Sequence, residues 1–236
     1  VRLDGGASIA HATEFENDGC EAALKVLKSA DAFHLRGGVT GVSIGACANQ
    51  TPDAVAGDLA SLLAALYHRA DYFTLNWGSI DAALMEEVLA ALTGKRATMR
   101  MRRPILLKLP GDITTEGMDT VLSLISRYGL DGVIATGPTM DRSQLRRYTE
   151  AELKALGAGG VSGKGMGMKS FFAVDYLRKH GGPDLFIIGA GGIMTPGDAE
   201  RMFRMGADYV QIYSAFIYEG PGIVARMVIR SAEMDE

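Results

Sequence analysis

The sequence has few cysteines, no long apolar run and no surplus of positive charge. Its two cysteines, Cys20 and Cys47, are too few for a framework of disulfides, which favours a reducing compartment. No apolar run reaches the roughly 18 residues of a membrane span, and no secretory signal opens the chain. Because the net charge is −4, nucleic acid is a poor candidate for the main partner.

Metal-ligand and nucleotide-triphosphate motifs are also missing. The four histidines are scattered, and the cysteines do not form the C-x-x-C pair of zinc sites, so no metal site is expected. The segment 159–164 ends in Ser-Gly-Lys but lacks the full spacing of a Walker loop, so a flexible loop over a cofactor fits better than ATP binding. Cys47 could be a reactive thiol, although an inert role is favoured.

Glycine is what the sequence has in excess, at 30 of 236 residues. Hydrophobic residues make up 47% and charged residues 22%, so a large buried core is expected and disorder is not. The glycines follow no three-residue period, which excludes a collagen-like chain. They therefore predict tight turns or places where the backbone approaches another group closely.

Short apolar runs alternate with amphipathic segments along the chain. Runs typical of buried parallel strands lie at 39–44, 72–75, 105–109, 132–136, 185–189 and 209–213. Helical spacing of apolar residues predicts helices between them, which begin after Thr51 and Thr195 and end at Gly129 and Gly206. This alternation predicts parallel β–α units in one α/β domain.

Two segments depart from this alternation. Residues 141–168 are charged and then glycine-rich, and their length favours a functional lid or binding loop over an ordinary turn. The second segment is basic and is expected to form a solvated surface; its residues are Lys95, Arg96, Arg100, Arg102 and Arg103.

The strongest chemical feature is the glycine-rich end of the strand at 185–189, which continues through Gly191 and Gly192. Backbone N–H groups at such a turn can bind an anion. The next strand ends at 212–214, and in α/β barrels phosphate often binds to the loops after the last two strands. Together the two loops favour a phosphate site over the alternative of a purely structural turn.

Three further polar residues lie on predicted strands or just beyond them. Lys108 lies within a buried run, where it is costly unless it faces a ligand or a counter-charge; a salt bridge with Asp112 is the alternative. Asn76 closes a strand and Ser79 follows it, at the end where barrel enzymes hold catalytic groups. Asn76 could bond a ring edge or a carboxylate and Ser79 could relay a proton, although by themselves these residues favour a turn.

In combination these motifs resemble the dihydroorotate dehydrogenases, in particular their quinone-using class 2 branch. The matching stretches follow one another over nearly the whole chain; they are 15–19, 41–45, 76–79, 107–109, 132–136, 159–164, 188–193 and 210–215. The resemblance implies a TIM (β/α)8 barrel with about six β–α units in this chain, forming one FMN-binding domain over 1–236. It also implies oxidation of dihydroorotate to orotate in pyrimidine biosynthesis, with a quinone as electron acceptor.

The resemblance also assigns roles by position. Positions that look like contacts of FMN are Lys108, Thr136, Gly163, Gly191, Gly192, Ile212, Tyr213 and Ser214. Lys108 would lie beside the flavin ring, where its charge would stabilise the reduced cofactor. Ser79 falls on the catalytic base and Asn76 on a substrate-binding asparagine.

Several positions differ from the family pattern. His11 and Gly137 stand where the family has asparagines, Ser43 stands at an asparagine that contacts FMN, and Pro138 replaces a threonine. Residues 80–82 likewise replace the family's Pro-Asn-Thr. Hydrogen bonds to the orotate ring and carboxylate would thus be missing, so two alternatives stay open: an FMN-barrel oxidoreductase with another substrate, and a non-catalytic homologue.

The number of strands is a further departure, because a closed barrel needs eight. At roughly 30 residues per β–α unit, we expect about 60 residues or more to be missing before Val1. Membrane association would come only through that missing segment. In a bacterium the protein would then be cytoplasmic and peripheral to the inner membrane, and in a eukaryote it would lie at the mitochondrial inner membrane.

Overall fold

The computed structural model describes residues 2–3, 7–11, 17–29, 31–47, 50–143, 145, 148–157 and 159–232. They belong to two compact units. The N-terminal unit comprises residues 14–108 and 123–132, and the C-terminal unit comprises 1–13, 109–122 and 133–236. Helix α5 (Thr115–Tyr128) contributes residues to both units.

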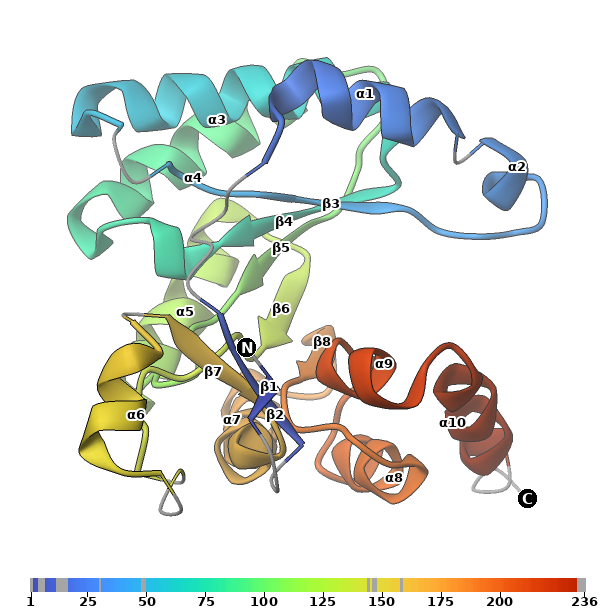
Figure 1. Ribbon diagram of the computed structural model, residues 1–236. Helices are drawn as coiled ribbons and strands as arrows, with labels where there is room; N and C mark the ends of the chain where they lie inside the picture. Colours follow the sequence, from blue (N-terminus) through green and yellow to red (C-terminus); the bar gives the residue numbers. More distant parts are fainter. Residues whose placement is uncertain are drawn as a thin grey trace. The chain divides into compact units, whose positions relative to one another are not determined.

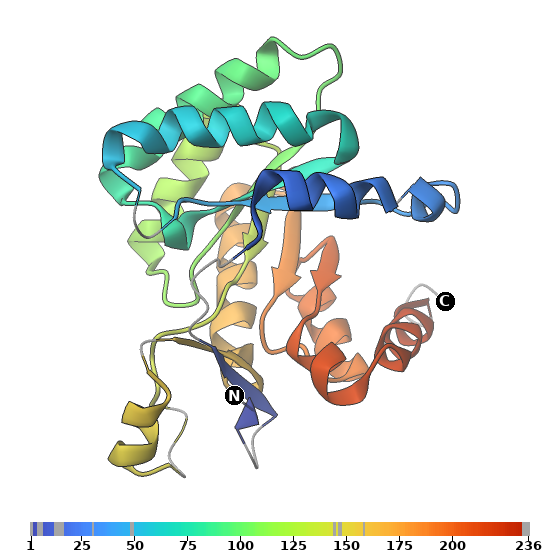
Figure 2. The ribbon, with the colours of Figure 1, turned by 45° about the horizontal axis from the view of Figure 1, so that its top comes forward.

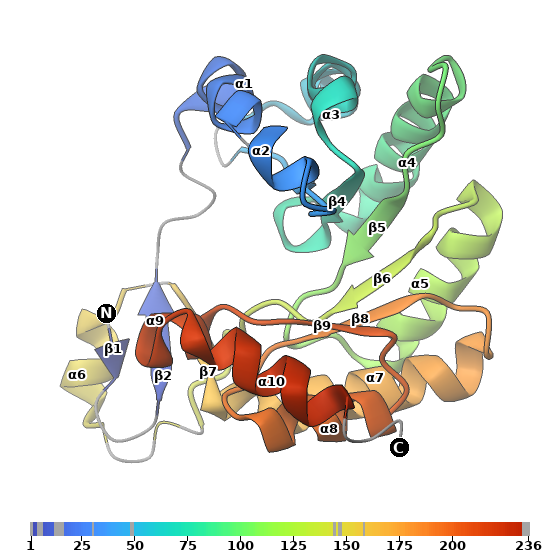
Figure 3. The same cartoon turned by 90° about the vertical axis from the view of Figure 1, so that its right-hand side faces the viewer.

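The N-terminal unit is built on three parallel strands in the order β3–β4–β5. Their bounds are Gly41–Ile44 for β3, Tyr72–Asn76 for β4 and Ile105–Lys108 for β5. The helices are α1 (Gly19–Ser29), α2 (Asp31–His34), α3 (Pro52–Leu66) and α4 (Ala82–Ala97), with short 3-10 turns η1 (Tyr67–Arg69) and η2 (Trp77–Ser79). Figure 3 shows α1, α3 and α4 on one side of β4 and β5.

The core of this unit lies between α3, α4 and the strands. Leu59 and Leu63 of α3 and Leu89 of α4 are almost completely buried, and burial of each such side chain stabilises the fold by about 1.5–3 kcal/mol. Helix α3 begins after Thr51 as predicted, although the Thr51 side chain makes no capping hydrogen bond. Helix α4 begins after Asp81, whose carboxylate accepts a hydrogen bond from the Ala83 N–H at 2.8 Å.

The basic segment is not a uniformly solvated surface, so that prediction is wrong for part of it. Arg96 is buried and donates to the Asp131 carboxylate at 2.6 Å and to the Gly129 carbonyl at 2.8 Å. Arg103 pairs with Asp71 at 3.2 Å. The acidic partners are distant in the sequence and approach only on folding, so local composition could not reveal these ion pairs.

The C-terminal unit contains three more parallel strands, in the order β6–β8–β9. Their bounds are Gly132–Ala135 for β6, Ile187–Ala190 for β8 and Tyr209–Gln211 for β9. The helices are α7 (Gly167–Gly181), α8 (Pro196–Arg204), α9 (Ser214–Glu219) and α10 (Gly222–Ala232). Helix α7 packs against β8, and α8 packs against β9 and α10 (Figure 2).

A small antiparallel sheet completes the C-terminal unit (Figure 1). Its strands lie in the order β1 (Arg2–Leu3), β2 (Ser8–His11) and β7 (Gly160–Gly163), and Ser8 pairs with Gly163. Helix α6 (Glu150–Ala155) and turn η3 (Lys164–Met166) flank β7. The prediction of one long loop over 141–168 is therefore wrong: the partner of β7 is the distant β2, and the glycines of β7 concealed it as a strand.

All six predicted parallel strands are present, each within two residues of its predicted bounds. The glycine stops are confirmed as well, since Gly129 and Gly206 take φ values of +60° and +106°, a left-handed region that favours glycine. Helix α8 has the predicted start, where the Thr195 hydroxyl accepts from the Asp198 N–H and the Asp198 carboxylate accepts from the Thr195 N–H.

Candidate functional site

The C-terminal unit brings several predicted cofactor residues to one edge of its parallel strands. Ala135 of β6 pairs with Gly189 of β8, and Ala190 of β8 pairs with Gln211 of β9. Because these strands are parallel and in register, the residues that follow them lie at the same edge. Those residues are Thr136 after β6, Gly191 and Gly192 after β8, and Ile212, Tyr213 and Ser214 after β9.

The Gly191–Gly192 turn has left-handed backbone at both residues, with φ values of +94° and +75°. A Cβ on Gly191 would lie 2.5 Å from the Ser170 hydroxyl oxygen, and a Cβ on Gly192 would overlap the backbone of Gly167. Packing against α7 therefore requires both glycines, whether or not a ligand is bound. The structure gives neither backbone N–H an acceptor among the described residues, so both can donate to an anion.

Ser214 connects the end of β9 to the antiparallel sheet. It is buried at the first position of α9, and its hydroxyl lies 3.0 Å from the hydroxyl of Ser162 on β7. Gly163, the next residue of β7, has φ +97°, and a Cβ there would overlap the Ala7 carbonyl. Tyr213 is exposed. These contacts place Gly163 of β7 beside the loop after β9.

Thr136 is buried rather than open at this edge. Its hydroxyl lies 3.0 Å from the Ser170 hydroxyl, and its backbone N–H donates to the Ala190 carbonyl at 2.6 Å. The Thr136 side chain therefore already has a protein partner. Sequence reasoning missed Ser170, because nothing in the local pattern of α7 distinguishes it from any other small helical residue.

The N-terminal unit brings Asn76 and Lys108 together. They are register partners at the carboxyl ends of β4 and β5. Side chains at paired positions of parallel strands point to the same face of the sheet, so the amide and the ammonium group share a face. Ser79 lies close by in the chain, in η2, but its side chain is outside the described part of the structure.

Lys108 is the charged group that most needs an explanation. Burial lowers the pKa of Lys108 below its usual 10.5, because an ammonium group loses hydration there. Among the described residues, no hydrogen bond or ion pair of this side chain is present. Asp112, the alternative partner, instead pairs with Lys169 at 2.5 Å. A desolvated cation that has no counter-charge among the described residues fits an anionic or electron-rich ligand.

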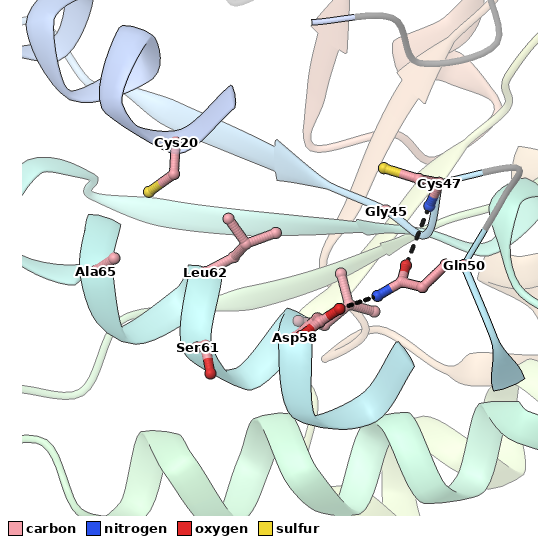
Figure 4. Close-up of a pocket in the computed structure, with 9 residues that line it drawn as sticks. Cys20, Gly45, Cys47, Gln50, Asp58, Ser61, Leu62 and Ala65 are labelled. Atoms are coloured by element: carbon pink, nitrogen blue, oxygen red, sulfur yellow. Dashed lines mark hydrogen bonds between the residues drawn. The ribbon is translucent and has the colours of Figure 1, made fainter. Parts of the chain in front are cut away.

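A separate hollow of about 600 Å³ lies in the N-terminal unit (Figure 4). Its lining comes from α1, the loop after β3, and α3; the residues are Cys20, Gly45, Cys47, Gln50, Asp58, Leu59, Ser61, Leu62 and Ala65. Gln50 accepts from the Cys47 N–H at 3.2 Å and donates to Asp58 at 2.5 Å. Cys47 is among the lining residues, but none of the residues predicted to bind the cofactor or the substrate lines this hollow.

Two positions that differ from the family pattern, Gly137 and Pro138, make backbone hydrogen bonds within the structure. The Gly137 N–H donates to the Leu109 carbonyl at 2.7 Å, and the Pro138 carbonyl accepts from the Gly111 N–H at 3.1 Å. This loop is thus held by its backbone and offers no side-chain amide. Ser43 is an exposed residue of β3, and the His11 side chain is outside the described residues.

Among the described residues, no helix is both long enough and apolar enough to cross a bilayer. Nor does this part of the chain bring three or more His, Cys, Asp or Glu side chains together as metal ligands.

Comparison with known proteins identifies close similarity to one family. The family model described as dihydroorotate dehydrogenase matches residues 1–232. A dihydroorotate dehydrogenase (quinone) of Sinorhizobium fredii is 36% identical over 96% of this chain and 64% of its own length. The corresponding protein of Bordetella avium is 33% identical over 96% of this chain and 67% of its own length.

Two solved structures share the fold. Both are DHODH from Eimeria tenella, one in complex with ferulenol and one ligand-free, with TM-scores of 0.85 and 0.86 at 22% and 23% identity. They cover 97% and 98% of this chain, and this chain covers 67% and 70% of theirs. The match confirms the α/β-barrel fold class. The chain spans 64% of the length of the Sinorhizobium fredii relative.

Proposed function

The chain belongs to the dihydroorotate dehydrogenase family, and from this premise we propose that the complete protein oxidises dihydroorotate to orotate with bound FMN and a quinone acceptor. The observation that carries the proposal is the edge of β6, β8 and β9. There the Gly191–Gly192 turn presents two backbone N–H groups that have no acceptor in the described part of the chain, next to the loop that follows β9. Such an arrangement suits the phosphate group of FMN.

The residues present at this edge fit a phosphate chemically. The donors of the turn are neutral backbone groups fixed by packing on α7, and no carboxylate is among the predicted contacts. Gly191, Gly192, Tyr213 and Ser214 would hold the phosphate, with Gly163, Ile212 and Thr136 as further contacts. Since the turn is already shaped by the protein, little ordering entropy would be lost on binding.

Bound FMN would supply the hydride acceptor that amino-acid side chains lack. Lys108 would hold its positive charge against the electron-rich part of the ring system, which favours the reduced state electrostatically. Asn76, on the same face as Lys108, would orient dihydroorotate through its amide. Ser79 would take the proton that leaves the substrate carbon, with a water or another partner to accept it onward.

A second candidate keeps FMN and changes the substrate. The observation that favours it is the loop at Gly137 and Pro138, which offers only backbone groups where the family has side chains able to bond orotate. A site that lacks such bonds loses discrimination by orders of magnitude. The partner would then be another small molecule with an oxidisable C–H bond. In both candidates a quinone acceptor implies a peripheral position at the membrane that dissolves it.

An absorption spectrum of the complete protein tests both candidates. Purified protein should show the visible bands of an oxidised flavin, and dihydroorotate should bleach them, after which a soluble quinone should restore them. Bands that persist after dihydroorotate would favour the second candidate. A colourless protein that cannot be reconstituted with FMN would overturn both.

Replacement of Ser79 tests its assigned role. Ser79→Ala should retain the flavin spectrum but slow bleaching by dihydroorotate by about 100-fold or more, because a positioned base typically contributes 10²–10⁴-fold. Stopped-flow absorbance measures this step. An unchanged bleaching rate would remove Ser79 from the proton path.

A further inference from the structure

The first turn of α7 forms the support beneath the Gly191–Gly192 turn. Gly167 and Ser170 are three residues apart on this helix, so they lie on one face. Gly192 packs against Gly167, and Gly191 packs against Ser170. Because there is no room for a Cβ at either contact, the position of this helix face fixes where the turn and its N–H groups lie.

Ser170 is the polar member of this face. It is completely buried, and its hydroxyl lies 3.0 Å from the hydroxyl of Thr136. Thr136 in turn donates its backbone N–H to the carbonyl of Ala190, the residue directly before Gly191. Ser170 is therefore connected to the turn in two ways. It packs directly against Gly191, and it is linked by hydrogen bonds through Thr136 to Ala190.

We infer that Ser170 is a positioning residue that sets the Gly191–Gly192 turn for a phosphate group and does not touch the ligand itself. The inference rests on the proposed function, because it assumes that the turn receives the phosphate of FMN. It concerns only the phosphate end of the cofactor. Riboflavin, which has the same ring system without the phosphate, therefore separates this role from general stability.

The test measures binding of FMN and of riboflavin by quenching of their fluorescence. In wild-type protein FMN should bind more tightly than riboflavin. Ser170→Ala should weaken FMN binding about 3- to 10-fold, the range that corresponds to one net hydrogen bond, and should leave riboflavin binding unchanged. Ser170→Val should weaken FMN binding further, because its methyl groups occupy the space beside Gly191.

A matched control is available in the same unit. Ser231 of α10 donates its hydroxyl to the carbonyl of Met227 in its own helix, so Ser231→Ala makes the same chemical change away from the turn. It should leave the ratio of FMN to riboflavin affinity at the wild-type value.

The outcomes separate the inference from the proposed function. If wild-type protein binds neither flavin, the proposed function fails. If it prefers FMN and Ser170→Ala keeps that preference, or weakens both flavins equally, Ser170 is structural only and the inference is wrong. A loss confined to FMN, with Ser231→Ala unchanged, supports it.

Discussion

At the scale of single residues, Lys108 shows a conflict between stability and binding. Burial disfavours its charged form, so the folded chain binds this proton less tightly than the unfolded chain does. The stability that depends on this group is therefore lowest below the lowered folded pKa, and it rises with pH between that pKa and the unfolded value near 10.5. A residue kept at such a cost is typical of a ligand site.

We expect Lys108→Met to stabilise the protein without FMN and to weaken FMN binding. Methionine has a similar volume and no charge to desolvate, so the free energy of unfolding at pH 7 should rise by roughly 0.5–2 kcal/mol. Urea denaturation without flavin and fluorescence titration with FMN measure the two effects. A variant that is less stable than wild type, or that binds FMN equally well, would contradict the role given to Lys108.

Among helices and strands, the predictions that were confirmed are those whose sequence signal lies within the element itself. The strands were visible because each is a continuous apolar run of its own, such as Ile105–Leu107, and the start of α8 was visible because Thr195 and Pro196 are neighbours. The antiparallel sheet was not predicted, because β2 and β7 contain no apolar run and form only by pairing with each other across some 150 residues. Thr136 was predicted as an FMN contact from the family resemblance. The contact of Ser170 with the Gly191–Gly192 turn can be recognised only from the packing of α7.

A second element-scale feature joins α7 to the loop after β6. The Lys169 ammonium lies 2.5 Å from Asp112 and 3.0 Å from Asp141, and Asp112 also accepts from Thr139 and from the Met140 N–H. Burial would raise the pKa of Asp112, but these hydrogen bonds outweigh it and the pKa is lowered. Hydrogen bonds from Ser143 and Lys169 lower the pKa of Asp141 to about 2.

We expect the contribution of this cluster to be lost in acid. A carboxylate with a depressed folded pKa stabilises the fold above its unfolded value of 3.8 and ceases to do so as the pH falls through about 2. Lys169→Met should therefore lower stability by about 1 kcal/mol or less at pH 5, because water screens the pairs, and the difference should close toward pH 2. Urea denaturation over this range measures it.

Lys179→Met is the control for that experiment, because Lys179 pairs with Asp175 on the outer surface of the same helix. It should change stability little at any pH in the range. A Lys169→Met difference that is independent of pH would show that the lysine acts through packing rather than through its charge.

At the scale of the whole molecule, several large apolar side chains of α9 and α10 are exposed in the described part of the structure. They are Phe216, Ile217, Val224, Val228 and Ile229, which are 38–63% exposed. Soluble monomers rarely leave large contiguous apolar patches uncovered. These exposed apolar side chains are expected to promote association of the protein at high concentration.

We expect Val228→Lys to reduce light scattering at high protein concentration and to reduce fluorescence of the dye ANS. Met101→Lys places a charge at an exposed apolar residue of the N-terminal unit and serves as the control. Equal effects from both substitutions would attribute the change to net charge alone.

The Gly191–Gly192 turn also has a consequence for isotope exchange. Its two N–H groups have no acceptor among the residues that the structure describes, whereas the nearby Thr136 N–H donates to the Ala190 carbonyl at 2.6 Å. In deuterated water the two glycine amides should exchange early and the threonine amide late. Bound phosphate would slow the glycine amides and leave the threonine amide unchanged. Three neighbouring amides would thus report occupancy of the site by mass spectrometry or NMR, even for a ligand that has no colour.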